Sequence, residues 1–181
     1  MSSLIYVTGV PGSGKSAIRR ELRRLGHVAV GTDEDGLASF FDADDCAVPA
    51  TDVVNSSESE WRSQHTWRMV PSRLNDLAAT AEGGRVFVCG SAENEGEVWH
   101  YFAAVVALVV DERTVNERLD ARLDNNFGKS ADERAKVVGW LRGYEENFRS
   151  YGAIVIDARP PIDEVAEAIL TATSHLAIDA P

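Results

Sequence analysis

This sequence of 181 residues has few cysteines, few basic residues and no long apolar run. Its two cysteines, Cys46 and Cys89, form neither a disulfide framework nor a metal-binding spacing. So low a cysteine content is typical of a reducing compartment. The N-terminus has no basic segment followed by an apolar stretch, so no signal peptide is expected. We therefore expect a cytoplasmic protein.

Basic residues are outnumbered by acidic ones. There are 18 Lys and Arg against 29 Asp and Glu, which gives a formal net charge of -11. Nucleic acids and anionic membranes are bound by clustered Lys and Arg, so neither is an expected partner. The longest apolar run, 101–110, is too short to span a bilayer. The length and the 44% hydrophobic content predict one globular domain, 1–181. We expect a monomer or homodimer.

Short apolar strands alternate with helical segments along the chain. Strands are predicted at 4–8, 27–30, 85–89, 104–110 and 153–156, and helices at 15–25, 58–81, 93–101, 112–123, 131–149 and 161–176. Pro71 is expected to break or kink its helix. Residues 33–57 are expected to be mainly loop, with a helical turn near 37–41. The alternation predicts an α/β domain with a parallel sheet.

The stretch IYVTGVPGSGKS (5–16) places G-x-x-x-x-G-K-S between a predicted strand and a predicted helix. Glycines let successive N–H groups surround an anion, and the helix adds the positive end of its dipole. We predict that Lys15 reaches the β- and γ-phosphates of ATP and that the Ser16 hydroxyl ligates Mg²⁺. The other predicted nucleotide-binding residues of this loop are Gly9, Pro11, Gly12, Ser13, Gly14 and Ala17.

Two large classes of proteins with this loop are disfavoured by the rest of the chain. The third predicted strand ends VFVCGS (86–91), where a motor-type ATPase carries an acidic residue. Asp33 to Gly36 fits D-x-x-G, a GTPase pattern, but the chain has no N-K-x-D motif to read guanine.

The order of elements resembles that of P-loop small-molecule kinases, a group that includes nucleoside monophosphate kinases, shikimate kinase and gluconate kinase. The motifs that carry the resemblance are the glycine loop, GTDEDG (31–36), CGSAENE (89–95), RLDAR with FGKS (118–130) and IDARPP (156–161). It implies a three-layer P-loop NTP hydrolase fold with a five-stranded parallel sheet of order 2-3-1-4-5. It also implies an acceptor-binding region at about 33–81 and a lid at about 118–135.

The resemblance assigns roles to four residues near the acceptor. Asp33 becomes the catalytic or Mg²⁺-facing carboxylate, and Asp35 becomes a secondary contact with the acceptor. Either residue alternatively caps a helical turn. Gly90 and Ser91 face the acceptor from the carboxyl end of a central strand. The alternative for Ser91 is the N-cap of the next helix.

The remaining candidate site residues are arginines. Arg118 and Arg122, which share a helix face, are implied to neutralise the transferring phosphoryl group from the lid base. Their alternative is pairing with neighbouring carboxylates. Arg159 is implied to stack on the adenine, and Arg62 to contact the acceptor.

The resulting expectation is an ATP- and Mg²⁺-dependent phosphotransferase acting on a hydroxyl of a small metabolite. A nucleoside monophosphate kinase is the alternative, with arginines near Arg62 and Arg73 binding the acceptor phosphate. The CG pair at 89–90 disfavours it, because such kinases usually carry Asp-Gly after the third strand. A second alternative is an ATP-binding regulatory protein with little transfer activity.

Overall fold

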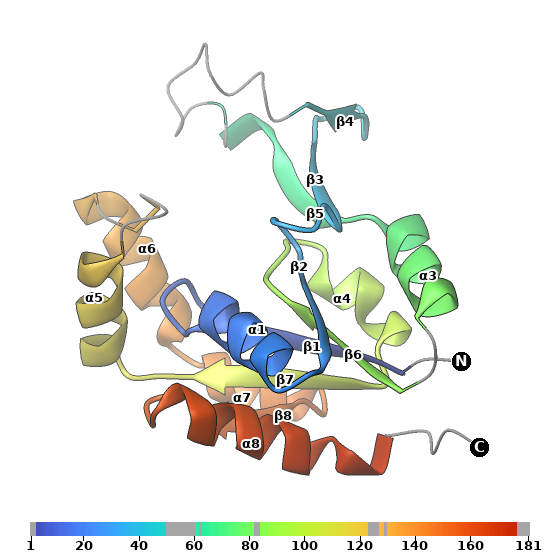
Figure 1. Ribbon diagram of the computed structural model, residues 1–181. Coiled ribbons are helices and arrows are strands. Elements are labelled where there is room, and N and C mark those ends of the chain that lie inside the picture. Colours follow the sequence, from blue (N-terminus) through green and yellow to red (C-terminus); the bar gives the residue numbers. More distant parts are fainter. Residues whose placement is uncertain are drawn as a thin grey trace.

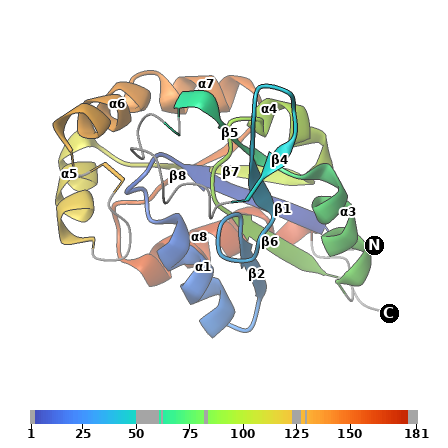
Figure 2. The ribbon, with the colours of Figure 1, turned by 90° about the horizontal axis from the view of Figure 1, so that it is seen from above.

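A five-stranded parallel sheet forms the centre of the computed structural model (Figure 1). The structure describes residues 3–49, 61, 63–81, 84–122, 127–128 and 130–176. The strands are β1 (Ser3–Gly9), β2 (Val28–Gly31), β6 (Arg85–Cys89), β7 (Ala104–Val109) and β8 (Ile154–Asp157). They lie in the order β2-β6-β1-β7-β8, with every neighbouring pair parallel (Figure 2). Numbered among themselves they give 2-3-1-4-5, which confirms the predicted order.

Helices cover both faces of this sheet. They are α1 (Lys15–Arg24), α3 (Pro71–Thr80), α4 (Glu95–Val98), α5 (Glu112–Ala121), α6 (Ala131–Leu141), α7 (Tyr144–Ser150) and α8 (Ile162–Ala172), with short 3-10 helices η2 (Trp99–Tyr101) and η3 (Ser174–Leu176). Alternate residues of a strand point to opposite faces. Accordingly Leu4 and Tyr6 of β1 pack in a core with residues of α3, α4 and α7. Ile5 and Val7 pack in a second core with residues of α1 and α8. The three-layer α/β architecture is confirmed.

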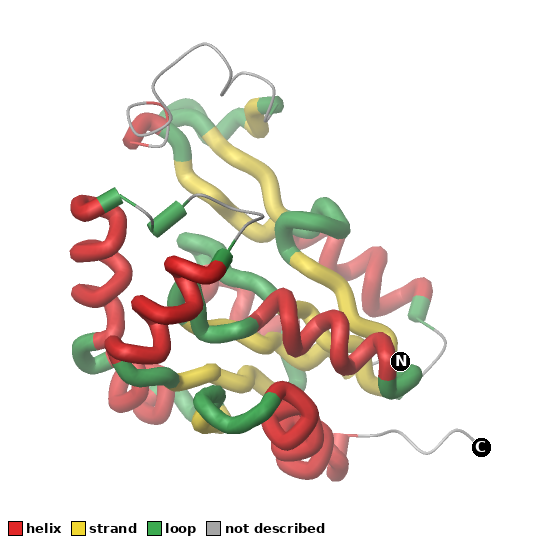
Figure 3. Tube along the Cα trace, turned by 60° about the vertical axis from the view of Figure 1, so that its left-hand side comes forward, coloured by secondary structure: helices red, strands yellow, loops and turns green. Residues whose placement is uncertain are grey.

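A second, smaller sheet corrects the prediction for residues 33–81. Strands β3 (Ala38–Phe41), β4 (Ala47–Val48) and β5 (Thr66–Met69) pair antiparallel in the order β4-β3-β5. Figure 3 shows them extending away from the main sheet. The expected loop at 33–57 and helix at 58–81 are wrong at these strands. β5 pairs with a segment more than twenty residues earlier, and local periodicity carries no information on such a partner.

Two helix boundaries also differ from the prediction. Pro71 begins α3 instead of kinking a longer helix, because the first helical turn needs no N–H donor from that residue. The expected helix 131–149 is divided into α6 and α7 at Gly143, whose φ of 74° is favourable for glycine. No helix within the described ranges has both the length and the apolarity needed to cross a membrane.

Candidate active site

The glycine loop between β1 and α1 is shaped for an anion. Gly12 and Gly14 have φ values of 86° and 106°, and a Cβ on Gly9 would lie 2.3 Å from Ser13 Oγ. The first hydrogen bond of α1 runs from Ile18 N–H to Gly14 O, at 2.9 Å. The amides of the first helical turn therefore have no intrahelical acceptor. Backbone donors and a helix dipole converge on one point, which fits a phosphate group.

Lys15 supplies the positive charge of this loop. Its Nζ donates hydrogen bonds to the carbonyls of Gly9 and, at 3.1 Å, Val10. Burial lowers the pKa of Lys15 to about 8, against the opposing attraction of Glu95 and Asp33. A half-buried ammonium whose hydrogen bonds go to neutral carbonyls gains from an anionic ligand.

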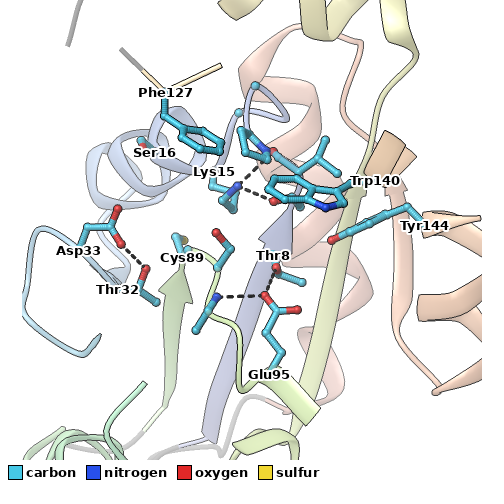
Figure 4. Close-up of a pocket in the computed structure, with 18 of the residues that line it drawn as sticks. Thr8, Lys15, Ser16, Thr32, Asp33, Cys89, Glu95, Phe127, Trp140 and Tyr144 are labelled. Carbon is cyan, nitrogen blue, oxygen red and sulfur yellow. Dashed lines mark hydrogen bonds between the residues drawn. The ribbon is translucent and has the colours of Figure 1, made fainter. Parts of the chain in front are cut away.

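The loop opens onto a cleft of about 1470 Å³ (Figure 4). The turns after β2 and β6 form one wall, and α5, α6 and α7 contribute residues to the other. Because all these strands are parallel, their carboxyl ends meet at this edge of the sheet. Of the predicted residues, the cleft is lined by Gly9, Pro11, Gly12, Gly14, Lys15, Ser16, Ala17, Asp33, Gly90, Ser91, Arg118 and Arg122.

Asp33 is positioned by the turn after β2. Thr32 donates from its backbone to Cys89 O at 3.1 Å and from its hydroxyl to Asp33 Oδ1 at 2.9 Å. The turn is thus fixed to the end of β6. Figure 4 shows Asp33 on the same side of the cleft as Lys15 and Ser16.

Gly90 has no side chain, and the turn after β2 occupies the space that a side chain there would fill. A Cβ on Gly90 would lie 1.9 Å from Thr32 Oγ1 and 2.6 Å from Thr32 Cβ. Gly90→Ala is therefore expected to displace Thr32 and Asp33 and to lower the free energy of unfolding by about 1–3 kcal/mol. Urea denaturation measures the change. Gly96→Ala is the control, because a Cβ there has no heavy atom within 4 Å. Equal free energies of unfolding for the two variants would show that the turn after β2 does not need a glycine at position 90.

Asp35 lies outside the cleft. Its Oδ2 accepts hydrogen bonds from Arg19 (2.9 Å), Arg23 (3.0 Å) and the Gly31 N–H (2.7 Å). These bonds fasten the turn after β2 to α1. They favour a structural role for Asp35 over contact with an acceptor.

Arg118 links three parts of the site. Its guanidinium donates to Ser13 O at 3.0 Å and to Ala158 O at 2.7 Å. It therefore joins α5 to the glycine loop and to the turn after β8. Arg122, at the end of α5, also lines the cleft, and its charge contributes to the lowered pKa of Lys15.

Arg159 is held on the surface by carboxylates. It bonds Asp157 Oδ2 at 2.7 Å and approaches Asp111 Oδ2 at 3.5 Å. It is absent from the linings of the cleft and of a smaller, adjoining cavity of about 210 Å³ between α1 and the turn at Ala158 and Pro160. Arg62 lies outside the described residues.

The cleft contains an acidic residue that the sequence prediction missed. Glu95 begins α4, and its Oε1 accepts hydrogen bonds from the hydroxyls of Tyr6 (2.6 Å) and Thr8 (2.9 Å). The Ala92 N–H is a third donor, at 3.3 Å. The CGSAENE motif contains both Glu93 and Glu95. Which of the two faces Thr8 depends on the position at which α4 begins.

The glycine loop, Lys15 and the sheet order together define a P-loop nucleotide-binding fold. The model of the AAA domain family matches residues 5–139, and the chain belongs to that family. No curated protein matches the chain.

Solved kinase structures share this fold over nearly the whole chain. Shikimate kinase from Acinetobacter baumannii, in complex with shikimate, has 18% identity and a TM-score of 0.63, covering 97% of this chain and 94% of that one. A gluconokinase from Sinorhizobium meliloti 1021 has 17% identity and a TM-score of 0.56, covering 97% and 93%. Deoxyadenosine kinase from M. mycoides with bound dATP has 14% identity and a TM-score of 0.53, covering 94% and 98%. The resemblance to P-loop small-molecule kinases is confirmed, at the level of the fold.

Proposed function

We propose that this protein transfers the γ-phosphoryl group of Mg-ATP to a hydroxyl of a small molecule. The observation that carries the proposal is the shared cleft, which brings a phosphate-binding loop and the carboxylate of Asp33 to one large cavity. Phosphoryl transfer needs this combination of charge neutralisation and an oriented acceptor. We propose that the single domain works in the cytoplasm, as a monomer or homodimer.

Each residue has a role in this proposal. The loop amides and Lys15 bind the phosphates, while Arg118 and Arg122 neutralise charge on the transferring group. Ser16 and Asp33 would hold Mg²⁺, which shields the negative charge of the phosphates. Asp33 also orients the acceptor hydroxyl and accepts its proton.

The smaller cavity is the proposed place of the adenine. It adjoins Ser13 and Gly14 of the loop and ends at Ala158 and Pro160. Backbone groups of the turn after β8, rather than the Arg159 side chain, are then available to the base. Arg118 lines both cavities. It would therefore lie where the sugar of the bound ATP connects to the phosphates.

Nucleotide affinity should fall above pH 8. The free protein loses the Lys15 proton near its pKa of about 8, and bound phosphates favour the charged form. Between pH 7 and pH 9 the affinity for Mg-ATP is expected to fall about 10-fold. Titration calorimetry at a series of pH values measures this change. Lys15→Gln should bind weakly at every pH, without the decline. A wild-type affinity that stays constant to pH 9.5 would contradict the assigned role.

ADP release with Mg-ATP and pooled acceptors tests the function. The pools are nucleoside monophosphates, nucleosides, sugar acids and other hydroxylated metabolites. Stimulation by a hydroxylated pool is expected. Stimulation only by monophosphates would indicate a nucleotide kinase, and ATP binding without any stimulation would favour a regulatory protein.

A further inference from the structure

Below the glycine loop, the cleft wall formed by the start of α4 presents the carboxyl group of Glu95, which has no ion-pair partner within 4 Å among the described residues. We propose that the acceptor has a protonated amine, and that Glu95 binds this ammonium group. The inference rests on the proposed function, since it assigns the substrate class of the same cleft.

Glu95 has one carboxyl oxygen available to a ligand. Three donors converge on its Oε1, an arrangement that suits a carboxylate and not a carboxylic acid. Among the described residues, no ion pair within 4 Å includes Glu95, and no hydrogen bond reaches its Oε2. A partly buried carboxylate with one oxygen unused gains strongly from a positive ligand.

A second acceptor lies close to this carboxylate. The Tyr144 hydroxyl is buried near Thr8 and makes no hydrogen bond within 3.5 Å among the described residues. Burial, followed by the charge of Glu95, raises the pKa of Tyr144, so this hydroxyl stays neutral. Figure 4 shows Tyr144 directed into the cleft. Because an ammonium group has three donors, it can satisfy both Glu95 and Tyr144.

Aromatic rings add to the preference for a cation. The cleft is lined by Phe40, Trp67, Trp140 and Tyr144. Trp67 is fixed by its neighbour Glu93, whose N–H donates to Trp67 O at 2.7 Å while its Oε1 accepts from Trp67 N–H at 2.9 Å. The faces of such rings attract cations, and the Glu93 carboxylate also lines this wall.

Two arginines on the acceptor side of the molecule are engaged outside the cleft. Arg68 pairs with Asp45 and Glu97. Arg73 donates to Gly36 O and Ser39 Oγ at 2.8 Å. Neither residue lines the cleft. Lys15 and Arg118 bind groups of the glycine loop, so their charge serves the phosphates.

The test compares small hydroxylated acceptors that carry a positive charge, no charge or a negative charge. Glucosamine, glucose and gluconate form one matched set, and 2-deoxystreptamine, myo-inositol and shikimate form another. Binding is followed by tryptophan fluorescence in the presence of Mg-ADP, separately from ADP release with Mg-ATP. In at least one set the amine should bind about 10-fold more tightly than the neutral compound. Glu95→Gln should remove this preference for the amine over the neutral compound. Glu97→Gln is the control, because Glu97 also belongs to α4 but does not line the cleft.

The outcomes separate this inference from the proposed function. Amine binding that depends on Glu95 supports the inference, even if no acceptor stimulates ADP release and the proposed function fails. Preference for the acids or the neutral compounds overturns the inference, and the proposed function stands if these stimulate turnover. Absence of binding by every amine, or an amine preference that survives in Glu95→Gln, also overturns it.

Discussion

Lys15→Met is expected to reduce the rate of phosphoryl transfer by about 10³-fold, because the loop loses the charge that accompanies the phosphates into the transition state. The side chain is half-buried at the loop, and no other described lysine lines the cleft to take its place against the carbonyls of Gly9 and Val10. Initial rates of ADP release with saturating acceptor measure the effect. Methionine replaces the apolar stem of lysine without its ammonium group, so the fold should be preserved.

Lys136→Met is the matched control for this change. Lys136 lies on α6 and is exposed to solvent, and it does not line the cleft. It should retain the wild-type rate. If the Lys15 variant kept more than about a tenth of the wild-type rate, the loop would not be the phosphate site that we assign.

Asp33→Asn should lower kcat by about 10²- to 10⁴-fold, because the amide cannot accept the proton of the acceptor hydroxyl. Asparagine retains an oxygen that can accept the hydrogen bond of Thr32, so the turn after β2 should keep its shape. The kcat for acceptor phosphorylation is the quantity to measure, with Mg²⁺ varied at each acceptor concentration. Asp44→Asn, in an exposed turn between β3 and β4, provides the control.

The Mg²⁺ titration separates two actions of Asp33. A loss of kcat that excess Mg²⁺ does not restore indicates proton acceptance, whereas a loss that it restores indicates a metal contact. A variant with near wild-type kcat at all Mg²⁺ concentrations would show that Asp33 has neither role.

The main sheet and the phosphate loop were predictable because their signals are local. Buried parallel strands such as β7 are apolar at nearly every position, and the loop glycines have a fixed spacing. The helix boundary at Gly14 and Lys15 is set by the same motif.

The acceptor side was predicted less well because its structure depends on distant contacts. The pairing of β3 with β5 joins segments separated by more than twenty residues, and TWRM has no periodicity that distinguishes it from helix. Glu95 meets Tyr6 and Thr8 only after β1 and α4 are packed together. Conversely, Asp35 was placed at the acceptor by resemblance, but its bonds to Arg19 and Arg23 hold it against α1.

The most direct test of the account tracks the phosphoryl group itself. The protein is incubated with Mg²⁺ and ATP labelled in the γ-phosphate, with and without the acceptor that stimulates ADP release most, and the products are separated. We predict that the label appears in a phosphorylated organic product in equal amount to the ADP formed. Label found only in inorganic phosphate, with every acceptor tested, would contradict the assignment of this protein as a small-molecule kinase.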